Sequence, residues 1–190
     1  MTWNKTHKKN TKERVLQSAA QLFTQEGYEK ISINQVMEHA QLTRGAFYAH
    51  FDSKSDLYAQ AIKTAANNAH QAISKTTSDD IASLANHYLS ATHRDKLLPQ
   101  SCPLACLITD ITQQDQKVKS VYTDVFKAFI TNIDKLTNDQ QRSFQIATLM
   151  IGGIALSKAL EDQKLSDSLL SACQSAISTL ANINKPSTDI

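Results

Sequence analysis

A short stretch near the start of the chain collects side chains that can hydrogen-bond to anions and to the edges of planar rings. Thr43, Arg44, Tyr48, His50 and Lys54 bring hydroxyl, guanidinium, imidazole and ammonium groups together. Arginine suits two parallel hydrogen bonds to a planar partner, whereas lysine acts as a point charge. The combination predicts contacts with phosphates and base edges.

Sequence motifs of catalysis are absent. The chain has no Gly-x-Ser-x-Gly, no His-Glu-x-x-His and no glycine-rich phosphate loop. Its six histidines, at positions 7, 39, 50, 70, 87 and 93, do not follow a metal-ligand spacing. We therefore expect a protein that is not an enzyme and has no metal or cofactor.

Local signals predict short helices around these side chains. Apolar residues at helical spacing predict a first helix from about 11 to Gly27, a residue type that commonly ends helices. Ser32 and Gln35 have the spacing of a capping box and predict the start of a second helix. Thr43 is placed to cap a third, short helix that runs through Phe51.

The second and third predicted helices are separated only by a tight turn at Gln41 and Leu42. Two short helices joined in this way are typical of a helix-turn-helix, in which the second helix enters the DNA major groove. A fourth helix is predicted from Ser53, which has Asp56 three residues later, to about 76. Many helical bundles contain such pairs, so the spacing alone is weak evidence.

The sequence Leu-Thr-Arg-Gly-Ala-Phe-Tyr-Ala-His-Phe-Asp-Ser-Lys-Ser-Asp-Leu at 42–57 is more specific. It closely resembles the signature of the tetracycline-repressor (TetR) family around its recognition helix, and the resemblance covers about 11–60. It implies an all-α protein, with a three-helix helix-turn-helix domain before a larger helical domain that binds ligand and dimerises. Ala49 departs from the pattern, because that position often holds an aromatic or polar residue.

Each residue of the stretch has a role that fits DNA. Thr43 offers a hydroxyl and backbone amides to a phosphate, and Arg44 is placed to reach a base edge. Gly45 and Ala46 keep the helix face thin. By resemblance, three residues bind phosphates and fix the register on DNA: Tyr48, His50 and Lys54. Taken singly, each is more often an ordinary surface or core residue.

Composition supports an all-helical chain with a basic start. Only 4 Gly and 3 Pro occur in 190 residues, and the net charge is +2. Lysines at 5, 8, 9 and 12 precede Arg14 with a single acid, Glu13, among them. We expect a basic arm at 1–10, a DNA-binding domain at 11–58 and a ligand-binding and dimerisation domain at 59–185.

The last two predicted helices, at about 140–162 and 166–183, are rich in apolar residues. The first is apolar nearly all round and contains Gly152 and Gly153, which permit a close approach of another helix. The second carries an apolar stripe that includes Cys173 and Ile177. The resemblance implies a homodimer through these helices, and a purely internal hairpin is the alternative.

The resemblance also implies a pocket for a small-molecule effector among the central helices. Its candidate residues are aromatic or polar, and ordinary core packing is the alternative for each one. These candidates are Tyr88, Cys106, Asp110, Tyr122, Phe126 and Phe129. Cys102 and Cys106, four residues apart at a predicted helix start, are also candidates for a thiol sensor, although cysteine often fills apolar space.

The leading interpretation is a repressor that binds a near-palindromic double-stranded operator and is released by a small molecule. A redox or electrophile sensor using Cys102 and Cys106 is the alternative, and an enzyme or scaffold on the same fold has no support. No signal peptide follows the basic start, and no apolar run spans a bilayer. We therefore expect a cytoplasmic protein without a membrane contact.

Overall fold

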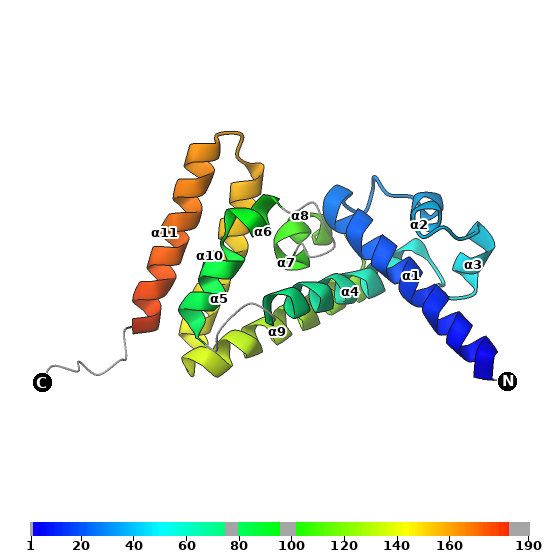
Figure 1. Cartoon of the computed structure of the whole chain (residues 1–190), viewed down its shortest axis with the longest axis horizontal. Coiled ribbons are helices and arrows are strands. Elements are labelled where there is room, and N and C mark those ends of the chain that lie inside the picture. Colours follow the sequence, from blue (N-terminus) through cyan, green and yellow to red (C-terminus); the bar gives the residue numbers. More distant parts are fainter. Residues whose placement is uncertain (1, 75–79, 96–101, 183–190) are drawn as a thin grey trace, which may run out of the picture. The chain divides into compact units, whose positions relative to one another are not determined.

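The computed structural model describes residues 2–74, 80–95 and 102–182, and every regular element within these ranges is an α-helix (Figure 1). The predicted fold class, all-α with an N-terminal helix-turn-helix and a C-terminal helical domain, is confirmed. Among the described helices, none combines the length and apolar character needed to cross a membrane.

Four helices make up the first part of the chain, and two of the predicted signals at their ends are formed. They are α1 (Thr2–Glu26), α2 (Ile33–His39), α3 (Arg44–Tyr48) and α4 (Lys54–Ser74). Ser32 and Gln35 form the predicted capping box, each side chain accepting a hydrogen bond from the backbone of the other. Gly27 follows α1 with φ of 81°, the left-handed conformation that favours glycine.

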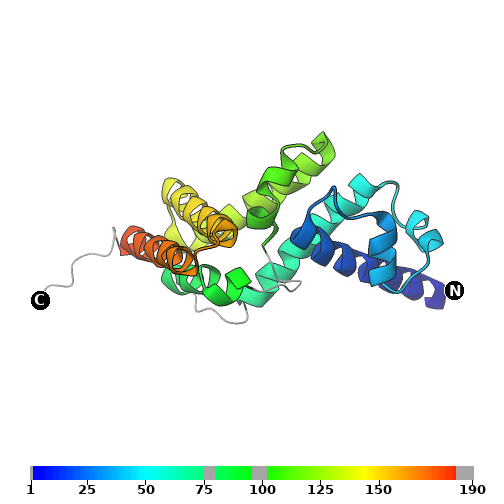
Figure 2. The same cartoon turned by 90° about the horizontal axis from the view of Figure 1, so that it is seen from above.

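Seven further helices follow. They are α5 (Ile81–Tyr88), α6 (Ala91–Asp95), α7 (Pro103–Cys106), α8 (Ile108–Ile111), α9 (Gln116–Thr137), α10 (Gln140–Ala159) and α11 (Gln163–Asn182). Figure 2 shows α10 and α11 side by side, and α11 also packs against α5. The N-caps of α5 and α10 are aspartates, Asp80 and Asp139, whose carboxylates accept a backbone N–H of the first turn.

Several predicted boundaries differ from the structure. The first helix begins at Thr2 and not near 11, so the basic residues lie on a helix and not in an extended arm. The earlier start was missed because the residues at 4–14 are polar and carry no apolar periodicity. The sequence also predicts a loop at 93–101, which contains Pro99, but residues 93–95 belong to the short helix α6, and 96–101 lies outside the described residues. Another loop is predicted at 76–79, which also lies outside them.

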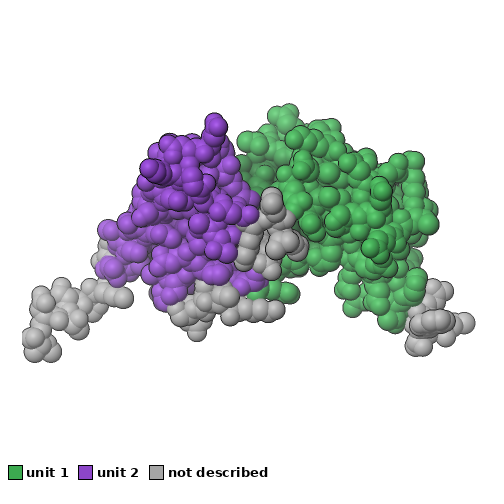
Figure 3. All heavy atoms as spheres, turned by 45° about the horizontal axis from the view of Figure 1, so that its top comes forward, with its two compact units in different colours: residues 1–71, 97–125 green, residues 72–96, 126–190 purple. Residues whose placement is uncertain are grey.

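The chain forms two compact units, coloured separately in Figure 3. Unit 1 contains Met1–Gln71 and Leu97–Val125, and unit 2 contains Ala72–Lys96 and Phe126–Ile190. This division follows packing, whereas the expected boundary after 58 divides the chain by function and stays a prediction. The core of unit 1 joins the first four helices to α8 and the start of α9 through buried residues that include Phe23, Phe47 and Tyr58.

In unit 2, two adjacent glycines of α10 have opposite surroundings. A Cβ added at Gly153 would lie 2.7 Å from Leu89 Cδ2 and 3.2 Å from Cys173 Sγ, whereas one at Gly152 would meet nothing within 4 Å. Gly153 therefore permits close packing with α5 and α11 of the same chain. The apolar stripe of α11 also turns inward, because Cys173 and Ile177 are buried.

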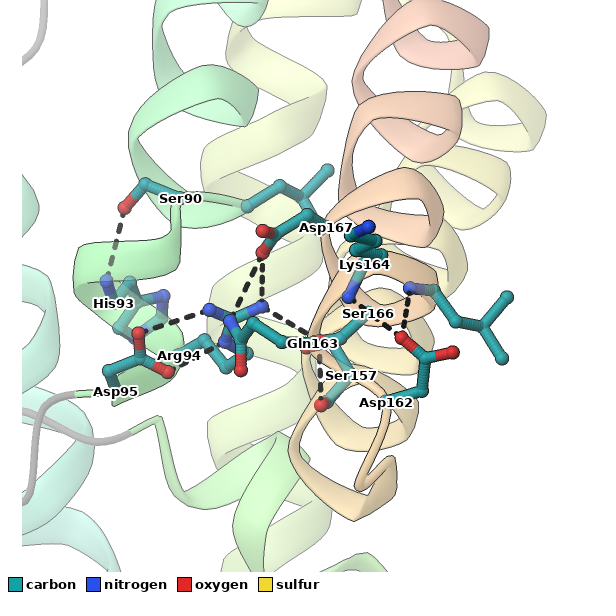
Figure 4. A network of polar contacts seen from close by, with 12 residues as sticks. Ser90, His93, Arg94, Asp95, Ser157, Asp162, Gln163, Lys164, Ser166 and Asp167 are labelled. Atoms are coloured by element: carbon teal, nitrogen blue, oxygen red, sulfur yellow. Dashed lines mark hydrogen bonds and ion pairs between the residues drawn. The ribbon is translucent and has the colours of Figure 1, made fainter.

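A buried guanidinium ties α6 to α11 in unit 2 (Figure 4). Arg94 donates from Nη1 to Asp167 Oδ1 at 2.6 Å and to Ser166 Oγ at 2.7 Å, and its Nε donates to Asp95 at 2.6 Å. Ser166 in turn donates to the carbonyl of Ser157 at 2.9 Å, which links the end of α10. A buried charge is tolerated only with such partners, so these contacts fix α6 on the α10–α11 pair.

The two glycines give a matched test of packing. We expect Gly153→Ala to lower the free energy of unfolding by about 1–3 kcal/mol, because the new methyl group forces Leu89 to move in a full core. Gly152→Ala adds the same methyl group where this chain has open space, so it should lower stability less than Gly153→Ala does. Urea unfolding of both variants checks this, and equal losses would exclude own-chain packing as the cause.

Candidate nucleic-acid interface

The turn between α2 and α3 is closed by backbone hydrogen bonds. Gln41 adopts φ of 54°, and the N–H of Leu42 donates to the carbonyl of Met37 at 2.9 Å. The guanidinium of Arg14 in α1 donates to the carbonyl of Ala40 at 2.7 Å, which satisfies an acceptor at the end of α2. These contacts fix the direction in which α3 leaves α2.

The short helix α3 is held by one fully buried side chain. Phe47 has no exposed surface, and its ring stacks on Phe51 with centroids 5.6 Å apart. Tyr48 packs edge-on against Phe47 at 5.1 Å but remains 62% exposed. Phe51 is buried as well, so the rings of Phe47 and Phe51 both belong to the core of unit 1, whereas most other residues of α3 are exposed.

The outward face of α3 carries the residues predicted to meet DNA. Thr43, Arg44 and Gly45 are exposed, whereas Ala46 is half-buried against the core of unit 1. Thr43 is the N-cap of α3, and its side chain makes no capping hydrogen bond. A Cβ at Gly45 would meet no atom of this chain within 4 Å, so internal packing does not require glycine there. The face offers one hydroxyl, one guanidinium and little bulk.

The start of α1 brings cations close to the end of α3. Burial lowers the pKa of His50, and the nearby charges of Lys8 and Lys12 lower it further. The ammonium of Lys12 lies 5.5 Å from the ring centroid of Phe51. Lys8 and Lys12 are four residues apart and share a helix face. The sequence showed both as basic residues but not their place beside His50, because the helix was expected to start later.

The last predicted contact residue, Lys54, lies at the start of α4. It is half-buried, and its Nζ is 4.1 Å from the centroid of the Tyr28 ring. The negative face of an aromatic ring attracts a cation at this distance. Tyr28 was not singled out from the sequence, although an aromatic residue directly after a helix-ending glycine is a visible signal.

Three of the predicted effector-binding residues lie in unit 1. Cys106 is half-buried, and the hydroxyl of Tyr122 donates to the carbonyl of Leu104 at 2.7 Å. Burial raises the pKa of Tyr122, and the neighbouring thiols of Cys102 and Cys106 add to the rise. Asp110 accepts hydrogen bonds from within the unit. Within the described ranges, no group of three His, Cys, Asp or Glu residues is placed to hold a metal ion.

The other three candidates lie in unit 2. The rings of Tyr88 and Phe129 are 5.7 Å apart, and those of Phe126 and Phe144 are 6.5 Å apart. Tyr88 is fully buried, whereas Phe126 and Phe129 are half-buried. Each pair is a contact of the kind that also forms ordinary cores.

Comparisons with known proteins agree with this geometry. Residues 15–61 match the family described as "Bacterial regulatory proteins, tetR family". The chain is 26% identical over 139 residues to an uncharacterized helix-turn-helix transcriptional regulator of Lactococcus lactis, covering 68% of this chain and 71% of that one. It is 29% identical over 52 residues to the negative transcriptional regulator IcaR of Staphylococcus aureus, covering 27% of this chain and 28% of IcaR.

The fold is shared over nearly the whole chain. A TetR-family regulator from Cytophaga hutchinsonii superposes with a TM-score of 0.78 at 16% identity, covering 91% of this chain and 96% of that one. The matched family segment, 15–61, spans the helix-turn-helix with its buried Phe47 and its exposed polar face. The helix-turn-helix segment thus matches the TetR family of DNA-binding transcriptional regulators, and the chain as a whole shares the fold of that family's members.

Proposed function

We propose that the chain is a repressor that binds a near-palindromic operator as a homodimer and is released by a small-molecule effector. DNA binding is assigned to 11–58, and effector binding and dimerisation to 59–185. The observation that carries the proposal is the exposed, polar face of α3 opposite the buried Phe47. The negative regulation named for IcaR supports repression over activation.

In this proposal the side chains of α3 divide between base reading and phosphate binding. Arg44 makes the base contact, with guanine as its favoured partner, and Gly45 and Ala46 allow the helix to approach the groove floor. Thr43 meets a phosphate at the start of α3. The remaining phosphate contacts come from the exposed Tyr48, from His50 with its neighbouring lysines, and from Lys54.

The proposed dimer uses the outer faces of α10 and α11. Phe144, Leu156 and Leu165 are 45%, 59% and 54% exposed, and they leave apolar surface on this helix pair that a second copy would cover. Gly152 faces open space and permits a close approach of the second copy. A two-fold dimer then presents two copies of α3 to two half-sites.

The proposed effector site lies beside α4 in unit 1. Cys106, Val121, Tyr122 and Val125 are partly buried residues that pack against the core of this unit. Because α4 follows the DNA-binding helices directly, an effector there would shift α3 in the dimer. The thiol alternative has less support, because Cys102 is buried and Cys106 half-buried, whereas reactive thiols need access.

Replacing Arg44 tests the base-reading assignment. We expect Arg44→Ala to weaken operator binding by about 1–3 kcal/mol and to relax the preference at one base pair in each half-site. Lys164→Ala removes one charge from an exposed site on α11 and should leave the preference unchanged. Selection of bound sequences from a random DNA library measures both, and an unchanged preference for Arg44→Ala excludes the assignment.

A charge on the outer face of α10 tests the dimer. Leu156→Glu should give a monomer with much weaker operator binding, because a carboxylate would be buried without a partner. Ile108→Glu places the same charge at a 46% exposed apolar residue of α8 and should leave the dimer intact. Light scattering at micromolar concentration measures the mass, and a monomeric parent chain would contradict the proposal.

A bulky side chain among the residues beside α4 tests the effector site. We expect an apolar or aromatic compound from a screen to weaken operator binding of the parent at least about 5-fold. Val125→Trp should abolish that response and keep operator affinity, whereas Thr123→Trp, at an exposed position of the same helix, should keep both. If peroxide alone released the operator and Cys102→Ser removed that effect, the thiol alternative would replace the proposal.

A further inference from the structure

The carboxylate of Asp110, on α8, lies at the corner where the chain leaves α1. Its Oδ2 accepts a hydrogen bond from the backbone N–H of Tyr28 at 2.9 Å and another from the hydroxyl of Tyr58 at 2.6 Å. A Cβ added at Gly27 would lie 3.7 Å from Asp110 Oδ1. The short helix α8, from the middle of the chain, therefore stabilises the corner between α1 and α2 through Asp110.

The bond from Tyr58 is a strong anchor. The side chain of Tyr58 is fully buried, and burial together with Asp110 raises the pKa of its hydroxyl, so that it keeps its proton and donates. A hydrogen bond to a carboxylate is shorter and stronger than one between neutral groups. Losing Asp110 would leave this buried hydroxyl without its acceptor.

The rings next to Asp110 continue toward the proposed DNA face. Tyr58 packs against Phe23 with centroids 4.8 Å apart and against Tyr28 at 4.9 Å. The ammonium of Lys54 lies over the other neighbour, Tyr28, at 4.1 Å. A lysine side chain has many rotamers, and a ring held in place restricts where its charge can be.

We infer that Asp110 is a positioning residue, which holds Tyr28 so that its ring places the ammonium of Lys54 for a DNA phosphate. The inference rests on the proposed phosphate role of Lys54. It gives Asp110 a part in DNA binding, although the residue lies on α8 and outside the matched family segment at 15–61. It differs from the effector-binding role expected for Asp110 from the sequence.

A double-mutant cycle tests the inference, with operator affinity measured at several salt concentrations. Affinity falls as salt rises, so the slope of log affinity against log salt is negative. Lys54→Ala should make this slope less negative by about one for each bound subunit. Asp110→Ala should weaken binding at least about 2-fold, the lower limit for residues in one network. In the Lys54→Ala background, Asp110→Ala should cause no further loss, because the ammonium it positions is gone.

Two variants separate positioning from charge and from folding. Asp115 precedes α9, and its carboxylate accepts a hydrogen bond from the hydroxyl of Ser55. Asp115→Ala removes the same charge as Asp110→Ala and should not weaken operator binding. Tyr28→Leu leaves Asp110 in place but removes the ring, and it should also add no loss to Lys54→Ala. This second cycle decides the question if Asp110→Ala does not fold.

The outcomes distinguish the inference from the function on which it rests. If the losses from Asp110→Ala or Tyr28→Leu multiply with that from Lys54→Ala, the inference is wrong and the phosphate role of Lys54 stands. If Lys54→Ala changes neither affinity nor salt slope, the phosphate role fails, and the inference fails with it. Retained affinity in both Asp110→Ala and Tyr28→Leu would also overturn it.

Discussion

A helix of five residues has too few backbone hydrogen bonds to persist alone, so α3 depends on the burial of Phe47. The ring has no exposed surface and stacks on Phe51, which closes the turn before α4. With this side chain fixed, the opposite face of α3 must point outward. The exposure of Thr43, Arg44 and Tyr48 therefore follows from the packing of one neighbour.

The corner between α1 and α2 has a different origin for its stability. The N–H of Gly27 donates locally to the carbonyl of Phe23, whereas the N–H of Tyr28 donates to Asp110, 82 residues away along the chain. A buried hydroxyl such as that of Tyr58 needs an acceptor, which makes the position of α8 costly to change. The helix-turn-helix of this chain thus depends on residues beyond the segment that resembles its family.

Local chemistry made part of the fold and of the candidate site predictable. The capping box of Ser32 and Gln35 and the left-handed Gly27 formed as expected, because each depends on residues a few positions away. The helical periodicity gave the fold class for the same reason. The candidate DNA face was located by the resemblance of the sequence at 42–57 to the TetR-family signature, because two short helices joined by a tight turn also occur in many other helical proteins.

The helical class, the capping box of Ser32 and Gln35 and the candidate DNA-binding stretch follow from local sequence, whereas the pairing of side chains follows from the packing of the folded chain. Gly152 and Gly153 are adjacent residues of the same type, so the sequence does not distinguish them, yet of the two only Gly153 packs against α5 and α11. Similarly, Asp110 is a polar residue on a short helix until Tyr58 is placed beside it. Local signals act through neighbouring backbone groups, but such contacts join residues far apart in the chain, and packing alone selects them.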